Sequence, residues 1–195
     1  MRHIGPELIR KSGHIAVAIL LAIALSTGNT ILFGVSALAL MVILGIIQKN
    51  PHMRQWLEAG RGVVGLWQLP LSTGIVGVLS LASGFPEIAW FSLLIVGIAD
   101  PFAGLAGALV PRRLFGGYDE GKTTVGTLLF LLVAIAIGWP LAVFVGYDVG
   151  ISFWPSVFMA ALCALVELNA PRNTDNFLLP PAAAIAWIFS TYALM

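Results

Sequence analysis

The sequence predicts an all-α integral membrane protein of about seven transmembrane helices, with its N-terminus in the cytoplasm and its C-terminus outside. Composition is the first reason, because 59% of the residues are hydrophobic and only 10% are charged, whereas roughly 25% are charged in a soluble domain. The second is a series of apolar stretches close to the about 20 residues that a helix needs to cross a bilayer. The third is the placement of the basic residues between those stretches. The net charge of +1 gives no reason to expect nucleic acid as a partner.

About seven stretches of the chain qualify, or nearly qualify, as membrane spans. They are residues 13–27, 30–47, 66–83, 86–110, 124–146, 151–168 and 177–194. The polar, Gly- and Pro-rich segments between them are typical of joints between spans. We therefore expect residues 1–195 to form a single helical membrane domain, with no room for a separate soluble one.

All the basic residues fall on one side of the membrane in this arrangement. They occur at positions 2, 10, 11, 49, 54, 61, 112, 113, 122 and 172, in the N-terminal segment and the second, fourth and sixth loops. The opposite loops contain Glu87 and Asp148 but no Lys or Arg. Because cytoplasmic loops carry the excess of basic residues, this side is predicted to be cytoplasmic. We expect a multi-pass protein of a cell membrane, with its ionisable groups at the cytoplasmic face.

An acidic residue, Asp100, lies inside the fourth apolar stretch. A charge at mid-membrane costs at least about 2.5–3.5 kcal/mol, so such an acid calls for a partner or a function. Pro101 follows it, and proline both removes a backbone donor and disfavours helix for the residue before it, so we expect the helix to break here. Broken backbone at this depth must face protein or a water-filled cavity. We expect Asp100 to point into a polar pocket open to the cytoplasm; the alternative is an ion pair with Arg or His of a neighbouring helix.

A Gly-rich, basic loop, residues 111–127, runs directly into the fifth predicted helix. Free N–H groups at a helix start, glycines that allow close approach, and the charges of Arg112, Arg113 and Lys122 together favour phosphate binding at the cytoplasmic face. The glycine spacing before Lys122 does not fit the Walker A pattern. The alternative is that the loop only sets the topology, with Thr123 or Thr124 as the N-cap of the helix.

A third group of polar residues lies at two helix ends on the same side as Asp100. Glu167 ends the sixth stretch, and Asp175 and Asn176 open the seventh. Hard oxygen ligands of this kind suit Mg²⁺ that bridges to phosphates. The alternative for Asp175 and Asn176 is an N-cap, which contributes about 1 kcal/mol.

A fourth group, Arg10, Lys11 and His14, lies at the cytoplasmic end of the first stretch. Residues 10 and 14 are one helical turn apart on one face, so Arg10 and His14 are candidates to meet a phosphate together. The alternative is that Arg10 and Lys11 only set the topology, with the Lys11 side chain extended toward the interface.

These groups, in this order and spacing, resemble the motifs of the CTP-dependent membrane lipid kinases, which include dolichol kinase, phytol kinase and the yeast-type diacylglycerol kinase. The motifs are Arg10-Lys11-x-x-His14, Asp100-x-x-Ala103-x-x-x-Gly107, Lys122-Thr123-x-x-Gly126-Thr127, and Glu167 with Asp175-Asn176-x-x-x-Pro180. The resemblance covers roughly residues 7 to 185, and departs from the family pattern at Ala99, Pro101, Gly121 and Val125. The chain is short beside eukaryotic dolichol kinases, which favours a prokaryotic version in the cytoplasmic membrane.

The resemblance implies transfer of the γ-phosphate of a nucleoside triphosphate, typically CTP, to a membrane lipid alcohol such as phytol, farnesol, geranylgeraniol or dolichol. The implied nucleotide-binding segment runs from Asp100 to Thr127 and includes Ala103, Gly104, Gly107, Thr123, Thr124 and Gly126. The acidic motif corresponds to Glu167, Asp175 and Asn176.

On this hypothesis, Lys122, Arg112 or Arg113 and the start of the fifth helix hold the triphosphate of CTP or ATP. Asp100, Glu167 and Asp175 hold Mg²⁺, and either Asp100 or Asp175 accepts the proton of the alcohol. Arg10 and His14 are expected to orient the phosphate or the acceptor, and Lys11 is expected to bind the nucleotide beside Arg10.

Two other functions fit parts of the pattern. A cytidylyltransferase that makes a CDP-lipid would use the same nucleotide and metal but release pyrophosphate. A small transporter would use Asp100 to bind an ion beside a broken helix. The clustering of polar groups at one face, with no second charged gate opposite, argues against the transporter.

Overall fold

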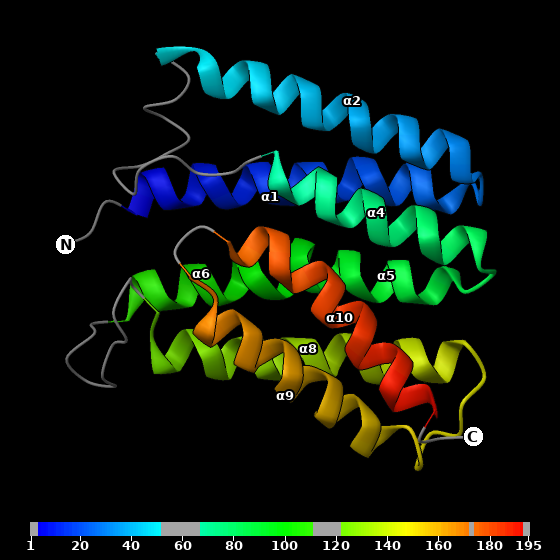
Figure 1. Ribbon diagram of the computed structural model, residues 1–195. Coiled ribbons are helices and arrows are strands. Elements are labelled where there is room, and N and C mark those ends of the chain that lie inside the picture. The colour runs from blue at the N-terminus through cyan, green and yellow to red at the C-terminus, as the bar shows by residue number, and fades with distance from the viewer. Residues whose placement is uncertain (1–3, 52–66, 111–121, 172–173, 193–195) are drawn as a thin grey trace.

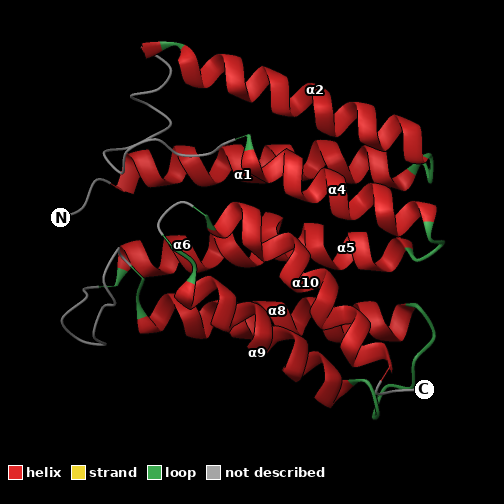
Figure 2. Cartoon of the chain, viewed as in Figure 1, coloured by secondary structure: helices red, strands yellow, loops and turns green. Residues whose placement is uncertain are grey.

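The computed structural model describes residues 4–51, 67–110, 122–171 and 174–192. These residues form helices joined by turns, and no strand occurs among them (Figure 2). The elements are α1 (Ile4–Ser26), α2 (Thr30–Lys49), α4 (Gln68–Ala82), α5 (Pro86–Leu94), the π-helix η1 (Ile95–Ala99), α6 (Asp100–Leu109), α8 (Thr124–Phe144), α9 (Phe153–Asn169) and α10 (Asp175–Tyr192). The predicted all-α class is therefore confirmed for the described residues.

Three helical segments of the described chain are long and apolar enough to cross a membrane. They are Thr30–Lys49, the continuous run Pro86–Leu109 formed by α5, η1 and α6, and Thr124–Phe144. Shorter apolar helices occupy Lys11–Ser26, Gln68–Ala82 and Phe153–Asn169. Large apolar side chains such as Ile31 and Phe189 are exposed on the outside of the bundle, as lipid contact requires.

The helices lie roughly side by side, and successive segments run in alternate directions along the bundle (Figure 1). The run α5–η1–α6 contacts α1, α8 and α10, whereas α2 lies at the edge against α4 and α1. The start of α1, the end of α6, the start of α8 and the end of α9 all lie at one end of the bundle, and α10 finishes at the other (Figure 1). This arrangement places sequence-distant polar residues at a common end.

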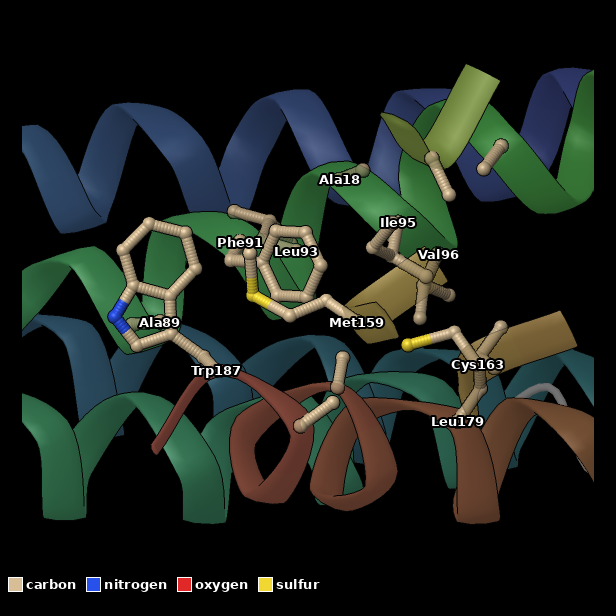
Figure 3. Packing of buried hydrophobic residues seen from close by; sticks show 14 of the residues in the cluster. Ala18, Ala89, Phe91, Leu93, Ile95, Val96, Met159, Cys163, Leu179 and Trp187 are labelled. Atoms are coloured by element: carbon tan, nitrogen blue, oxygen red, sulfur yellow. The ribbon is translucent and has the colours of Figure 1, made fainter. Parts of the chain in front are cut away.

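The core consists mainly of small and aromatic side chains drawn from α1, α5, η1, α9 and α10 (Figure 3). The rings of Phe91 and Trp187 lie with their centroids 5.2 Å apart, beside Met159. A Cβ atom added at Gly97 in η1 would come within 2.4 Å of the Ala18 Cβ. Because Gly97 has no side chain, α1 packs directly on η1, and the polar end of α1 is held against α6.

The predicted helix break at Asp100 and Pro101 is wrong. Asp100 has helical dihedrals, with φ −64° and ψ −44°, and its N–H donates to the carbonyl of Ile95, five residues earlier. In an α-helix the ring of Pro101 would clash with the carbonyl four residues before it. The π-helical turn just before the proline changes the hydrogen-bond register instead, so the helix continues. Single π-helical turns are frequently found at functional sites.

Candidate functional site

Asp100 is buried at the polar end of the bundle against two residues of α1. The Lys11 Nζ donates to Asp100 Oδ2 at 2.6 Å, and the His14 Nδ1 lies 3.5 Å from the same oxygen. The side chains of Lys11 and Asp100 are 2% and 5% exposed. We call Lys11, His14 and Asp100 the Asp100 cluster. Of the two sequence interpretations, the structure matches the ion pair with a neighbouring helix, but its main partner is Lys11.

A second ionic group lies where α8 begins and α9 ends. The Lys122 Nζ is 2.6 Å from Glu167 Oε1 and 3.7 Å from Asp175 Oδ2. We call these three residues the Lys122 cluster. Their side chains are 18%, 9% and 17% exposed, so this group is more accessible than the Asp100 cluster.

Lys122 remains positively charged in this setting. Burial acts to lower its pKa, but the charges of Glu167 and Asp175, the hydrogen bond to Glu167 and the more distant charge of Asp100 together raise the pKa above its ordinary value.

Asn176 connects the two clusters. Its Nδ2 lies 3.4 Å from the His14 Nε2, and its backbone N–H donates to Asp175 Oδ1 at 3.0 Å. Side chains from α1, α6, α9, α10 and the residue pair before α8 therefore form one polar network inside an otherwise apolar bundle. Sequence reasoning singled out each of these residues, in four separate motifs, and the structure brings them together.

The first turn of α8 shows a capping role for Thr123. Its Oγ1 accepts a hydrogen bond from the N–H of Gly126 at 3.1 Å, with extended backbone at φ −133° and ψ 147°. A Cβ at Gly126 would lie 2.9 Å from the Ala103 carbonyl oxygen, and one at Gly107 would lie 2.7 Å from Thr123 Oγ1. The residues Gly107, Gly126 and Ala103 thus form the close crossing of α6 and α8. Thr124 opens α8, and Gly104 lies in α6.

Three predicted basic ligands cannot be placed. Arg112 and Arg113 lie outside the described residues, and Arg10 lies in α1 without a described side chain. The pairing of Lys11 with Asp100 was not predicted. The available signal was helical spacing, since residues 11 and 14 share a face and both meet Asp100.

The predicted three-carboxylate metal site does not assemble around one point. Within the described ranges, no group of three or more His, Cys, Asp or Glu side chains is placed to hold a metal ion. Asp100 faces Lys11, whereas Glu167 and Asp175 share Lys122. Glu167 and Asp175 are thus the carboxylates that already converge on one cation.

The network combines paired cations, carboxylates, an imidazole and an amide in one place. Such a set can bind a polyanion through its cations and a divalent metal through its carboxylates. No protein-family model, curated protein or solved structure matches the chain.

Proposed function

We propose that this chain is a membrane phosphotransferase that moves the terminal phosphate of a nucleoside triphosphate, CTP or ATP, to the hydroxyl of a membrane lipid alcohol. The observation that carries the proposal is the polar network at one end of the bundle. Ionisable groups inside an apolar bundle are costly, and they are typically retained at functional sites. The order and spacing of the motifs, which resemble those of the CTP-dependent lipid kinases, supply the choice of reaction and the preference for CTP.

Phosphoryl transfer requires mainly that reactants are positioned and that negative charge is neutralised. Lys122 stands at the start of α8 with a positive charge and an 18% exposed side chain, and it is the residue to which we assign the phosphates. The start of a helix adds a favourable dipole for an anion. Arg10, Arg112 and Arg113 remain predicted contributors to the same binding.

Mg²⁺ usually takes one or two carboxylates from the protein and completes its shell with water and substrate phosphates. Glu167 and Asp175 provide the two carboxylates that Mg²⁺ needs from the protein, because both side chains already lie beside the charged Lys122 Nζ. They are the residues that would hold the ion. Bound Mg²⁺ would supply neutralisation of charge on the transferred phosphate.

Sequence reasoning left Asp100 and Asp175 open as acceptors of the alcohol's proton. The side chain of Asp175 is more exposed than that of Asp100. Asp175 Oδ2 lies 3.7 Å from the Lys122 Nζ, whereas Asp100 Oδ2 lies only 2.6 Å from the Lys11 Nζ. We therefore assign proton acceptance to Asp175. Asp100 acts as a positioning residue, because it fixes His14, which in turn contacts Asn176 next to Asp175.

The topology belongs to the same proposal. The helices alternate in direction, and the start of α1, the end of α2 and the start of α8 lie at one end of the bundle (Figure 1). Lys11 lies in the first half of α1, Lys49 ends α2 and Lys122 precedes α8, which supports about seven spans with that end in the cytoplasm. Glu87 and Asp148 would then face the outside. Single cysteines introduced into a Cys163→Ser background at residues 28 and 148 test this, because only outside positions should react with a membrane-impermeant thiol reagent in intact cells.

The activity is tested with purified protein in nanodiscs, Mg²⁺, γ-labelled CTP or ATP, and a panel of farnesol, geranylgeraniol, phytol, dolichol and diacylglycerol. We expect label on a lipid alcohol and release of the nucleoside diphosphate. Lys122→Ala should abolish transfer, whereas Lys49→Ala, an exposed lysine at the same end, should not. Pyrophosphate release with a CDP-lipid product would assign the chain to the cytidylyltransferases instead. Equal transfer by wild type and Lys122→Ala would refute the proposed site.

A further inference from the structure

The ammonium group of Lys122 lies where a metal ion held by Glu167 and Asp175 would lie. Its Nζ is 2.6 Å from Glu167 Oε1 and 3.7 Å from Asp175 Oδ2, so it faces one oxygen of each carboxylate. An ion bound to Glu167 Oε1 at about 2.1 Å would stay within about 5 Å of the present Nζ position, because that nitrogen is 2.6 Å from the same oxygen. Two cations this close repel each other. Lys122 and the ion therefore compete for the same two oxygens.

The charge of the Lys122 cluster favours a divalent ion over the ammonium group. The two ionised carboxylates carry two negative charges, and within the cluster Lys122 offsets one of them. A divalent cation would offset both, and carboxylate oxygens are ligands that Mg²⁺ prefers. The side chains of Glu167 and Asp175 are only 9% and 17% exposed, so water screens the remaining negative charge poorly. The cluster therefore attracts a cation of higher charge than the one it contains.

A second lysine in the same network, Lys11, gives a comparison. Lys11 forms its ion pair with one carboxylate, that of Asp100, and the two side chains are 2% and 5% exposed. Lys122 lies beside two carboxylates, and its side chain is 18% exposed. A ligand from outside the bundle therefore has access to Lys122, whereas burial closes off Lys11.

The side chain of Lys122 can leave the carboxylates by rotation of its own stem. Lysine carries its ammonium group on a flexible stem of four carbons, and Lys122 comes directly before Thr123, the N-cap of α8. The start of a helix favours negative charge, and phosphate groups commonly bind there. An ammonium group released from Glu167 would therefore meet a phosphate group at the start of α8.

Either ligand alone would leave part of the cluster without its counter-charge. A metal ion alone would separate the Lys122 ammonium group from both carboxylates. Phosphate groups alone would draw Lys122 away from Glu167 and leave two carboxylates beside an anion. When both bind, the carboxylates face the metal ion and Lys122 faces the phosphates. Each ligand should therefore strengthen the binding of the other.

We propose that Lys122 holds the place of the divalent ion between Glu167 and Asp175 until the ion binds, and then turns to the phosphate groups of the nucleotide. The contact is an autoinhibitory ion pair, which the ion and the phosphates open together. This inference rests on the proposed function for the nucleotide, and it adds a coupling between the binding of the two ligands.

The test is zero-length cross-linking of the wild-type protein, which does not require phosphate transfer. A membrane-permeable carbodiimide joins the Lys122 amine to a contacting carboxylate with loss of water, and the linked peptides are identified by mass spectrometry. In phosphatidylcholine nanodiscs without divalent ions, we expect a link from Lys122 to Glu167, since the reacting groups are 2.6 Å apart. Free Mg²⁺ should abolish this link, whereas Na⁺ at the same ionic strength should not. A link that is absent without Mg²⁺, or that Mg²⁺ leaves unchanged, would overturn the proposal.

Non-hydrolysable analogues of CTP and ATP, added in turn, separate the effects of the two ligands. With EDTA present, an analogue alone should leave the link in place, because Glu167 would otherwise lose its counter-charge. At controlled free Mg²⁺, at least one analogue should lower the Mg²⁺ concentration that halves the link, by a factor of about 5–150. If neither analogue shifts this midpoint, the two ligands bind independently and the coupling is refuted.

Matched variants supply a second measurement, the binding of Mn²⁺ followed by the electron paramagnetic resonance of the free ion. Lys122→Met removes the competing ammonium group, so without nucleotide it should bind Mn²⁺ at least about tenfold more tightly than wild type. Lys49→Met removes an exposed lysine at the end of α2 and should bind Mn²⁺ as wild type does. Weaker or unchanged Mn²⁺ binding by Lys122→Met would contradict the proposal, because removal of a competitor must raise the affinity for the ion.

The two proposals fail in different ways. Cross-linking and Mn²⁺ binding that follow these expectations, without phosphate transfer to any lipid, would retain the exchange of Lys122 for a divalent ion and remove the kinase. Phosphate transfer that depends on Lys122, together with a cross-link that Mg²⁺ leaves unchanged, would retain the kinase and remove the exchange.

Discussion

The buried contact between Lys11 and Asp100 gives a prediction whose magnitude follows from the structure. The charged atoms are 2.6 Å apart, and the side chains are 2% and 5% exposed. At an effective dielectric constant of about 20 the attraction is about 6 kcal/mol. Removing two charges from water costs several kcal/mol for each. The net contribution of the pair to stability is therefore small, but either charge left alone is strongly destabilising.

The perturbation is a double-mutant cycle with Lys11→Met and Asp100→Asn. Each single substitution leaves one uncompensated buried charge and should lower the free energy of unfolding by about 3–5 kcal/mol. The double variant buries no charge at this point, so it should be more stable than either single variant. We expect a coupling energy of about 3 kcal/mol or more.

The assay is reversible unfolding of the protein in bicelles, followed by circular dichroism. Lys49→Met with Asp148→Asn provides the control cycle, because both residues are exposed and lie at opposite ends of the bundle. These two changes should be additive within about 0.5 kcal/mol. If the coupling energy between Lys11 and Asp100 were as small as in the control cycle, the ion pair would not form in the protein. Asp100 could then not be assigned as a positioning residue.

Three other outcomes are expected in the same unfolding assay. Gly126→Ala should lower the free energy of unfolding by about 1–3 kcal/mol, because the added methyl group would lie 2.9 Å from the Ala103 carbonyl oxygen of α6. Gly13→Ala is the control, because nothing lies within 4 Å of its added Cβ, and it should not lower the free energy of unfolding. The pKa of Lys122 is raised above 10.5 in the folded state. Its contribution to the free energy of unfolding should therefore be complete below pH 10.5 and be lost as the pH rises through the folded-state pKa. In Lys122→Met, stability should no longer fall over this alkaline range. Ser72→Ala should cost about 1 kcal/mol by leaving the Phe177 carbonyl without its 2.6 Å donor, and an unchanged midpoint would mean that the bond is not formed.

The sequence was sufficient to find the helices and the ionisable residues of the polar network, because both signals are local. An apolar run of the right length predicts a helix in lipid. An ionisable residue within such a run stands out by its cost, and this identified Asp100. Glu167 and Asp175 were identified by their positions at two helix ends on the same side. The placement of basic residues then indicated that the candidates share one end of the bundle, and in the structure they belong to one connected polar network.

The partners of these residues were not predictable, because they depend on packing between distant segments. Lys11 had two equivalent interpretations in sequence, a topological charge or a ligand, and only the contact of α1 with η1 shows that it meets Asp100. The helix break was predicted from the local rules for proline, which do not include a change of hydrogen-bond register.

The difference in exposure between the two clusters separates their roles. A buried charge with an ion-pair partner is weak evidence for a functional role, because the partner alone offsets the cost of burying it. The Asp100 cluster is of this kind, and substitutions there should act first on stability. The Lys122 cluster holds two carboxylates on one lysine and keeps Lys122 and Asp175 nearly one-fifth exposed, which a purely structural pair does not need. A ligand therefore has access to the Lys122 cluster, and substitutions such as Asp175→Asn should abolish transfer at nearly unchanged stability. If Asp175→Asn instead unfolds the protein and leaves the transfer rate of the folded fraction intact, the roles of the two clusters are reversed.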